Sequence, residues 1–247
     1  MKIGYDGKFL WQDAAFGAKS GHGVHAIELL RHMMALDQKS AFSVYLIAAD
    51  GSLPSQSNFD YVELPGLASS SIWRNLVAYP LELARRPVDV MLSYSTLPAL
   101  LKCRTVLLLA DIFWMANPQW LPRRYAMLRT LATKASVKRA DRIVTTTEFS
   151  KREIMRYLNV PEERISIVPH GIKDALRARQ SDETIGHVRR KYGIERDYIL
   201  SINDIHPRKN LVGLIRAYDI ARKASGFAHQ LVVVGRSEER RVGKECA

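Results

Sequence analysis

The sequence predicts an α/β protein: a doubly wound, Rossmann-like parallel sheet followed by the start of a second domain of the same kind. Strand-like runs recur along the chain, and several are continuously apolar and β-branched, as strands buried on both faces are. Helical patterns with 3.6-residue spacing separate some of these runs. A new β-α-β pattern begins near Tyr198, after a polar stretch.

The first domain opens on a strand and continues with six more. The predicted strands are Lys2–Tyr5, Phe42–Ile47, Tyr61–Leu64, Val88–Ser93, Thr105–Leu109, Arg142–Thr146 and Ile165–Val168. Between the first two, Val24–Leu36 places Ile27, Leu30 and Met34 on one helical face. Later, Ser150–Glu153 has the pattern of a capping box and predicts a helix that starts there.

The second domain is predicted to begin with a β-α-β unit. A short helix is expected over Gly186–Tyr192, a strand over Tyr198–Ile202, a helix over Asn210–Ala224 and a strand over Gln230–Val234. We therefore predict an N-terminal domain over residues 1–175, a linker over 176–190 and a second domain over 191–235.

The end of the chain has a different character from the rest. Residues 236–246, RSEERRVGKEC, follow a buried-strand pattern at once and are similar to the translation of a common sequencing adapter. We expect residues 236–247 to be an artefactual tail and the second domain to be truncated near Gly235.

Composition excludes several classes of protein. The two cysteines, Cys103 and Cys246, form no CxxC or Cys/His cluster, so neither a disulfide framework nor a zinc site is expected. No apolar run reaches the roughly 18 residues of a membrane span, and the N-terminus lacks the apolar region of a signal peptide. We predict a cytoplasmic protein without a metal cofactor.

The net charge of +12 raises the question of an anionic partner. Residues 112–140 hold no acidic residue and six basic ones, and Tyr125, Leu128, Leu131 and Ala132 can form an apolar stripe among them. Such a segment is either an ordinary basic surface helix or a helix that lies on anionic lipid at the inner membrane face. Beyond charge there is no nucleic-acid-binding motif, so no nucleic acid is expected.

Three places combine residues that suit an anionic ligand. Gly21 and Gly23 form a glycine loop before a helix, where backbone N–H groups can approach an anion, although a flexible loop fits equally well. Asp111 follows a strand, at the edge where open α/β sheets bind ligands, but caps and turns also use Asp. Arg208 and Lys209 follow another strand and suit a diphosphate, unless they belong to a solvated loop with Asn210 as its helix cap.

Taken in order, these pieces resemble the retaining glycosyltransferases of family 4 (group 1 type), which have the GT-B architecture. The matching stretches are IGYDGKFL, GHGVHAIELLRHM, LADIFWMANPQWLP, ADRIVTTTEFSKREIMRYLNVPEERISIVPHGI and YILSINDIHPRKNLVGLIRAYDIA.

The resemblance implies a glycosyltransferase of hexosyltransferase type. Its N-terminal domain would take a glycan or lipid-linked acceptor, its C-terminal domain a nucleotide-sugar donor, and no metal would be needed. Arg208 and Lys209 would meet the donor diphosphate, Gly21 and Gly23 would lie near its phosphate end, and Asp111 would sit at the cleft floor.

The sequence departs from this family at three points. Ala110 replaces the histidine that often precedes Asp111, Asn203 replaces a usual glycine, and the paired glutamates would lie beyond Gly235. The truncated chain is therefore expected to be inactive, and a non-catalytic GT-B-like binding protein is the alternative hypothesis.

Overall fold

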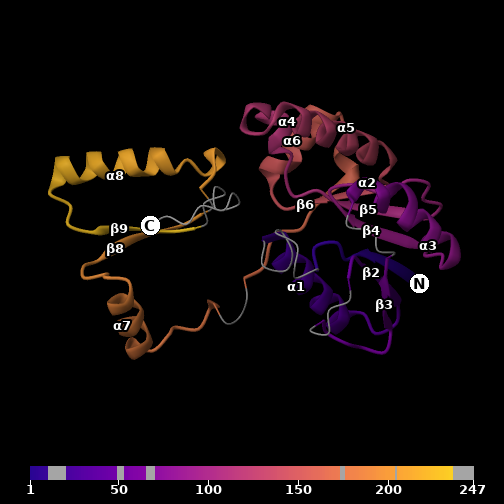
Figure 1. Cartoon of the computed structure of the whole chain (residues 1–247), viewed down its shortest axis with the longest axis horizontal. Coiled ribbons are helices and arrows are strands. Elements are labelled where there is room, and N and C mark those ends of the chain that lie inside the picture. Colours follow the sequence, from indigo (N-terminus) through magenta and orange to yellow (C-terminus); the bar gives the residue numbers. More distant parts are fainter. Residues whose placement is uncertain (11–20, 49–52, 65–69, 173–175, 204, 236–247) are drawn as a thin grey trace. The chain divides into compact units, whose positions relative to one another are not determined.

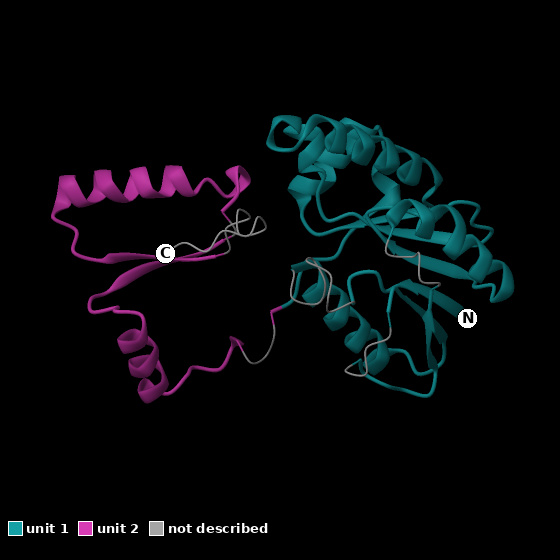
Figure 2. Ribbon diagram, in the orientation of Figure 1, with its two compact units in different colours: residues 1–171 teal, residues 172–247 magenta. Residues whose placement is uncertain are grey.

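A computed structural model describes residues 1–10, 21–48, 53–64, 70–172, 176–203 and 205–235. The chain forms two compact units, Met1–Gly171 and Ile172–Ala247 (Figures 1 and 2). The division comes after Gly171, and the predicted linker, residues 176–190, contains most of a helix of the second unit. Each unit is described by itself.

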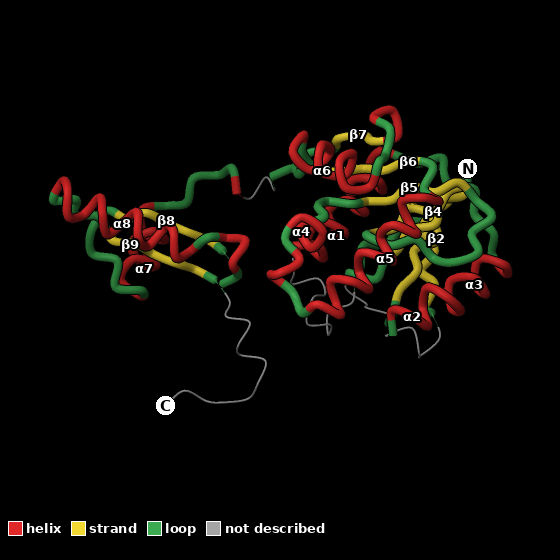
Figure 3. The backbone as a smooth tube through the Cα atoms, turned by 90° about the horizontal axis from the view of Figure 1, so that it is seen from above, coloured by secondary structure: helices red, strands yellow, loops and turns green. Residues whose placement is uncertain are grey.

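Unit 1 is built on a parallel seven-stranded sheet in the order β3-β2-β1-β4-β5-β6-β7. Figure 3 draws the strands in yellow among the helices of the unit. Its strands are β1 (Lys2–Asp6), β2 (Ala41–Leu46), β3 (Phe59–Glu63), β4 (Val90–Tyr94), β5 (Arg104–Leu108), β6 (Arg142–Thr145) and β7 (Ile165–Ile167). The order runs outward from β1 to β3 on one side and from β4 to β7 on the other. This is the doubly wound arrangement that the sequence predicts.

Helices pack on both faces of this sheet. They are α1 (Gly21–Leu36), α2 (Ser71–Trp73), the π-helical turn η2 (Arg74–Ala78), α3 (Tyr79–Arg85), α4 (Phe113–Ala116), η3 (Pro118–Trp120), α5 (Arg123–Arg139), α6 (Glu148–Leu158) and η4 (Glu162–Arg164). In β2, Phe42 and Val44 pack in the cluster that contains Leu30 of α1, whereas Tyr45 packs with Tyr79 of α3. Successive strand residues point to opposite faces, so α1 and α3 lie on opposite sides.

A third buried cluster joins β5 and β6 to the helices that follow them. Leu107 and Ile143 from the strands are fully buried, with Val137 of α5 and Ile154 of α6 against them. These strands carry continuous aliphatic runs because both of their faces meet other elements.

Two helices of unit 1 begin earlier than the sequence predicts. Helix α1 begins at Gly21 instead of Val24, and α6 begins at Glu148 instead of Ser150. The cap of α6 is Thr147, whose hydroxyl accepts the backbone N–H of Ser150 at 3.0 Å. The predicted capping box at Ser150 is wrong because Thr147, three residues upstream, takes that role.

Unit 2 is small. It contains α7 (Asp182–Lys191), β8 (Tyr198–Ile202), the 3₁₀ turn η6 (Pro207–Lys209), α8 (Leu211–Ser225) and β9 (Gln230–Val234). Strands β8 and β9 pair in parallel, and both predicted strand ranges are confirmed. Helix α7 begins four residues before its predicted start, because Ser181 caps it by accepting the N–H of Thr184 at 3.2 Å.

Candidate functional site

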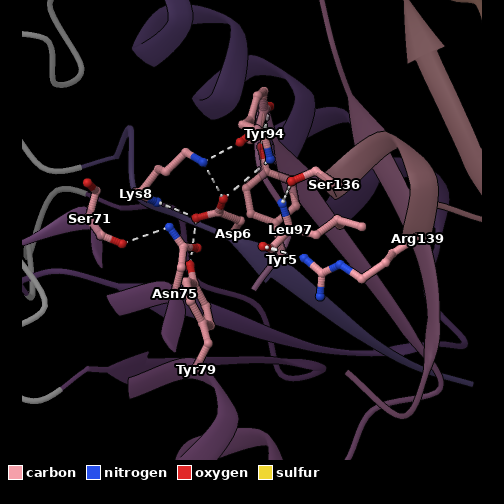
Figure 4. Close-up of polar contacts among 10 residues, drawn as sticks. All are labelled: Tyr5, Asp6, Lys8, Ser71, Asn75, Tyr79, Tyr94, Leu97, Ser136 and Arg139. Carbon is pink, nitrogen blue, oxygen red and sulfur yellow. Dashed lines mark hydrogen bonds and ion pairs between the residues drawn. The ribbon is translucent and has the colours of Figure 1, made fainter. Parts of the chain in front are cut away.

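The carboxyl edge of the unit 1 sheet carries a dense polar network (Figure 4). Strand β1 ends there at Asp6 and β4 at Tyr94, and ligands of open α/β sheets bind beyond this edge. Since the two strands are neighbours in the sheet, their last residues lie close together. This network therefore holds the backbone of the surface that a ligand would contact at this edge.

Asp6 is the centre of the network and is almost fully buried. The Lys8 ammonium lies 2.9 Å from its Oδ2, and the Tyr79 hydroxyl donates to its Oδ1 at 2.6 Å. The backbone N–H of Tyr94 adds a weaker bond at 3.3 Å. Burial alone would raise the pKa of Asp6, but the charge of Lys8, the Tyr79 hydrogen bond and the charge of Arg74 outweigh it and lower the pKa.

The turn after β1 lets Lys8 reach back to Asp6. The backbone N–H of Gly7 donates to the carbonyl of Tyr45 at 2.8 Å, and a Cβ at Gly7 would come within 2.6 Å of that oxygen. Only glycine fits this approach. The ammonium of Lys8 also donates to the carbonyl of Tyr94, so it joins the end of β1 to the end of β4.

Tyr94 connects this network to α1. Its hydroxyl lies 2.9 Å from the hydroxyl of Tyr5, which donates to the carbonyl of Ala26 at 2.7 Å. The hydroxyl of Tyr94 also lies 3.4 Å from Nδ1 of His25, whose ring stands edge-on to His170 with 4.6 Å between centroids. Burial, then the neighbouring rings of His170 and His22, lower the pKa of His25.

Hydrogen bonds with side chains of α5 hold the loop that follows β4. The N–H of Leu97 donates to the hydroxyl of Ser136 at 2.9 Å, and the guanidinium of Arg139 donates to the carbonyls of Pro98 and Leu97 at 2.8 and 3.2 Å. Two residues of this loop adopt the left-handed backbone conformation: Ser95 and Leu100. Such strain persists only where surrounding contacts hold it.

The predicted site residues of unit 1 lie toward this same edge. Asp111 follows β5 and is partly buried, and the carbonyl of the preceding Ala110 accepts the hydroxyl of Thr145 at 3.3 Å. Gly21 and Gly23 lie within the first turn of α1 and do not form a loop before it. That part of the glycine-loop prediction is wrong; residues 11–20, where the chain approaches α1, lie outside the described residues.

The predicted cations of unit 2 lie on η6, at the carboxyl end of β8. Arg208 and Lys209 are exposed, and the N–H of Arg208 donates to Nδ1 of His206 at 3.2 Å. Asn210 stands at the N-cap of α8, but it adopts a left-handed conformation and its side chain makes no capping bond. The predicted cap position is confirmed, but the side chain does not cap the helix: the amide of Asn210 lies over Gly213, where a Cβ would meet it at 2.5 Å.

The described part of the chain offers neither a metal cluster nor a membrane-spanning helix. No group of three or more His, Cys, Asp or Glu side chains there could hold a metal ion. No helix there is long and apolar enough to cross a membrane. A shallow pocket of about 500 Å³, lined by residues such as Asp89 and Cys103, lies at the amino edge of the sheet, opposite the edge where ligands of such folds bind.

Sequence reasoning missed the Asp6 network. The signal was present in the run Tyr5-Asp6-Gly7-Lys8, which ends a buried strand with two opposite charges around a glycine. Their partners Tyr79 and Tyr94 lie 73 and 88 residues away, so no local pattern joins them.

Comparison with known proteins decides the family. Residues 19–176 match the model of Glycosyltransferase Family 4, which is more than half of the chain. The chain belongs to glycosyltransferase family 4. The predicted GT-B-like architecture agrees with the parallel sheet of unit 1 and with the solved structures described next.

Curated relatives of this family 4 chain come from Escherichia coli. It is 28% identical to O-antigen chain mannosyltransferase B over 133 residues, which covers 53% of this chain and 35% of that protein. It is 29% identical to the serotype-specific mannosyltransferase WbdA over 87 residues, 35% of this chain and 11% of that protein. The chain thus spans about a third or less of these relatives.

Two solved structures share its fold. Anabaena Alr3699/HepE, solved in complex with UDP and glucose, superimposes with a TM-score of 0.63 at 13% identity, over 98% of this chain and 62% of that one. WaaG, a glycosyltransferase involved in lipopolysaccharide biosynthesis, gives a TM-score of 0.63 at 17% identity, over 97% of this chain and 65% of that one.

Proposed function

We propose that this chain is part of a glycosyltransferase that moves a hexose from a nucleotide-sugar donor to a glycan or lipid-linked acceptor, with retention at the anomeric carbon. The observation that carries the proposal is the family 4 match over residues 19–176, on a parallel seven-stranded sheet. Because the curated relatives are mannosyltransferases, mannose is the first sugar to test. We place the activity in the cytoplasm, in a protein that carries a whole second domain.

In this proposal Arg208 and Lys209 bind the donor diphosphate. They lie on η6 directly before the N-terminus of α8, where the helix dipole also favours an anion. When the bond between sugar and diphosphate breaks, negative charge grows on the leaving group. Cations already in place stabilise that charge more than they stabilise the ground state, so they lower the barrier.

Unit 1 supplies the acceptor side. Asp111 and the N-terminus of α1 lie toward the edge that the Asp6 network holds in place, and we propose that Asp111 contacts the reacting groups. A rigid edge matters because small misplacements of a substrate slow transfer strongly. The transfer is proposed to need no metal, so a chelator should leave the rate unchanged.

The test uses protein extended beyond Gly235 to a whole second domain, assayed for transfer and hydrolysis with a panel of nucleoside diphosphate sugars. Substituting Arg208 and Lys209 together with Met should lower kcat/KM at least about a hundredfold, because two charge-assisted contacts are lost. The matched control is Arg216→Met, an exposed cation on α8, which should stay within about twofold. The proposal fails if no nucleotide sugar is turned over.

A peripheral membrane contact is the second part of the proposal. It is supported by the outer face of α5, where Tyr125, Leu128 and Leu131 are exposed among basic residues. Vesicles with and without anionic lipid provide the test. Binding that requires anionic lipid and is lost in Leu128→Glu supports the contact, and equal sedimentation with neutral vesicles contradicts it.

A further inference from the structure

Arg129 is held in an unusual way at the edge of unit 1 where β5 ends. It lies in the second turn of α5, half-buried, with its guanidinium carbon 3.7 Å from the ring centroid of Trp114 and 6.0 Å from that of Phe113. Both rings belong to α4, which begins two residues after Asp111. The distance to Trp114 is that of a guanidinium stacked on the ring, and this stacking restricts the plane of the guanidinium beside the predicted site.

The charge of Arg129 is not neutralised by the described part of the chain. A guanidinium has five N–H donors, and the hydroxyl of Tyr125, 3.4 Å from Nη1, is the acceptor that the described residues provide. No described carboxylate forms an ion pair with it. Arg139 on the same helix shows the contrast, because two loop carbonyls satisfy its guanidinium.

The positive charge of Arg129 acts on Lys8, the ion-pair partner of Asp6. Burial lowers the pKa of Lys8, the charge of Asp6 opposes this, and the charges of Arg74 and Arg129 lower that pKa further. Arg129 is therefore close enough to Lys8 for its charge to be felt there. The carboxylate of Asp6 is already paired with the Lys8 ammonium, and it forms no ion pair with Arg129 among the described contacts.

The stacking partner has a cost that phenylalanine would avoid. Trp114 is 1% exposed, and its indole Nε1 has no hydrogen-bond partner in the described structure. A buried orphan donor is unfavourable, whereas Trp presents the best aromatic face to a cation. Holding Arg129 flat is a role that would explain a tryptophan at this position.

From this geometry we infer that Arg129 binds a phosphate group of the substrate at the carboxyl edge of unit 1. A guanidinium with a fixed plane offers two parallel N–H donors to a phosphate, the arrangement that makes arginine selective for this group. Assigning that phosphate to the acceptor rests on the proposed function. The acceptor class is then a sugar or lipid that carries a phosphate or diphosphate ester.

Binding of inorganic diphosphate to the whole chain, measured by calorimetry, tests the site without any turnover. Arg208→Met/Lys209→Met serves as the background, so that the proposed donor cations do not contribute. In that background diphosphate should bind saturably, and Arg129→Met should weaken it at least about tenfold, since a charge-assisted contact is lost. Arg124→Met, an exposed cation on the same helix, should change it by less than about twofold.

Arg129→Lys separates binding from a packing role. It keeps the charge but removes the planar fork, so diphosphate should bind about threefold to tenfold more weakly while the melting temperature stays the same. Unchanged diphosphate affinity in Arg129→Lys and Arg129→Met, or an equal loss in Arg124→Met, overturns the inference.

Two competing ligands identify the source of the phosphate. An alkyl diphosphate should displace inorganic diphosphate from unit 1 better than uridine diphosphate does if the acceptor carries the group. The reverse order assigns the site to the donor and overturns the acceptor class. If diphosphate binds at Arg129 but the extended protein turns over no nucleotide sugar, the site stands and the proposed function fails.

Discussion

The two units are built from the same β-α-β pattern, yet they differ in how much they bury. Unit 1 has seven strands and three buried clusters around its sheet. In the described part of unit 2, Ser201 is the one residue that is buried. The contrast shows that a sequence can specify strands and helices correctly without providing a core.

The reason lies in strand number. In unit 1 each central strand has neighbours on both sides, so residues such as Ile143 are enclosed by helices and adjacent strands. In the described residues of unit 2 the sheet has two strands, and Ile199 and Leu200 remain 38% and 48% exposed. A sheet of this size buries too little apolar area to offset the chain entropy lost on folding.

The largest expected difference between the units is in hydrogen exchange. Amides of β8 and β9 should exchange at least about a thousandfold faster than those of β4 and β5, because unit 2 opens at a much lower free energy. Exchange mass spectrometry on the whole chain, resolved by peptide, measures this. Equal protection from exchange in the two sheets would contradict this and would show that unit 2 is as stable as unit 1.

The buried ion pair should dominate the polar energetics of unit 1. Asp6→Asn leaves the Lys8 ammonium buried without its partner and should cost about 3–5 kcal/mol of unfolding free energy. Its counterpart in unit 2, Asp219→Asn, removes an exposed pair with Lys223 and should cost less than about 1 kcal/mol. Chemical denaturation compares them, and a cost below about 1 kcal/mol for Asp6→Asn contradicts the network.

The same carboxylate sets a pH dependence. The folded pKa of Asp6 is lowered, so its contribution to stability is complete above the unfolded value of about 3.9 and is lost as pH falls through the lowered folded value. Between about pH 4 and pH 2, wild type should therefore lose stability more steeply than Asp6→Asn. Parallel curves would exclude Asp6 as a source of acid sensitivity.

Matched aliphatic truncations compare the two cores directly. Ile143→Ala removes a fully buried side chain of β6 and should cost about 3 kcal/mol, whereas Ile199→Ala on β8 should cost under about 1 kcal/mol. Urea titrations followed by circular dichroism give both values. Comparable costs would mean that Ile199 is enclosed in the folded chain.

The smallest expected effects come from the helix caps. Thr147→Ala and Ser181→Ala each remove a hydroxyl that accepts a backbone N–H, worth about 1 kcal/mol to its helix. In unit 1 the loss should lower the global melting temperature, since α6 packs into the core through Ile154. In unit 2 it should fray α7 without shifting the main transition, and a shared downward shift would show that the units unfold together.

The strands could be predicted from the sequence because their signal is local. Runs such as Tyr198–Ile202 are apolar except for Ser201, so their bounds follow closely from composition. Helix starts were less accurate, because Thr147 and Ser150 both suit a cap and the surrounding fold decides between them. The left-handed turn at Asn210 also depends on geometry that residue type does not reveal.

The candidate site divides in the same way. Asp111, Arg208 and Lys209 can be proposed from the sequence because each follows a strand, and position relative to a strand end is a local property. Asp6 and Arg129 cannot be recognised in this way, because what marks them is their contact with Tyr79 and Trp114, and the fold makes those contacts. Long-range partners are the part of a site that one sequence shows least.

The contact between Asn210 and Gly213 lies directly after the basic pair Arg208 and Lys209. The amide of Asn210 occupies the space that any side chain at Gly213 would need. Asn210 is the residue after Lys209, and replacing Gly213 would force its amide into another rotamer. The small residue at position 213 thus leaves room for the side chain of a left-handed residue, so a copy of the basic dipeptide without Asn210 and Gly213 would lack this local packing.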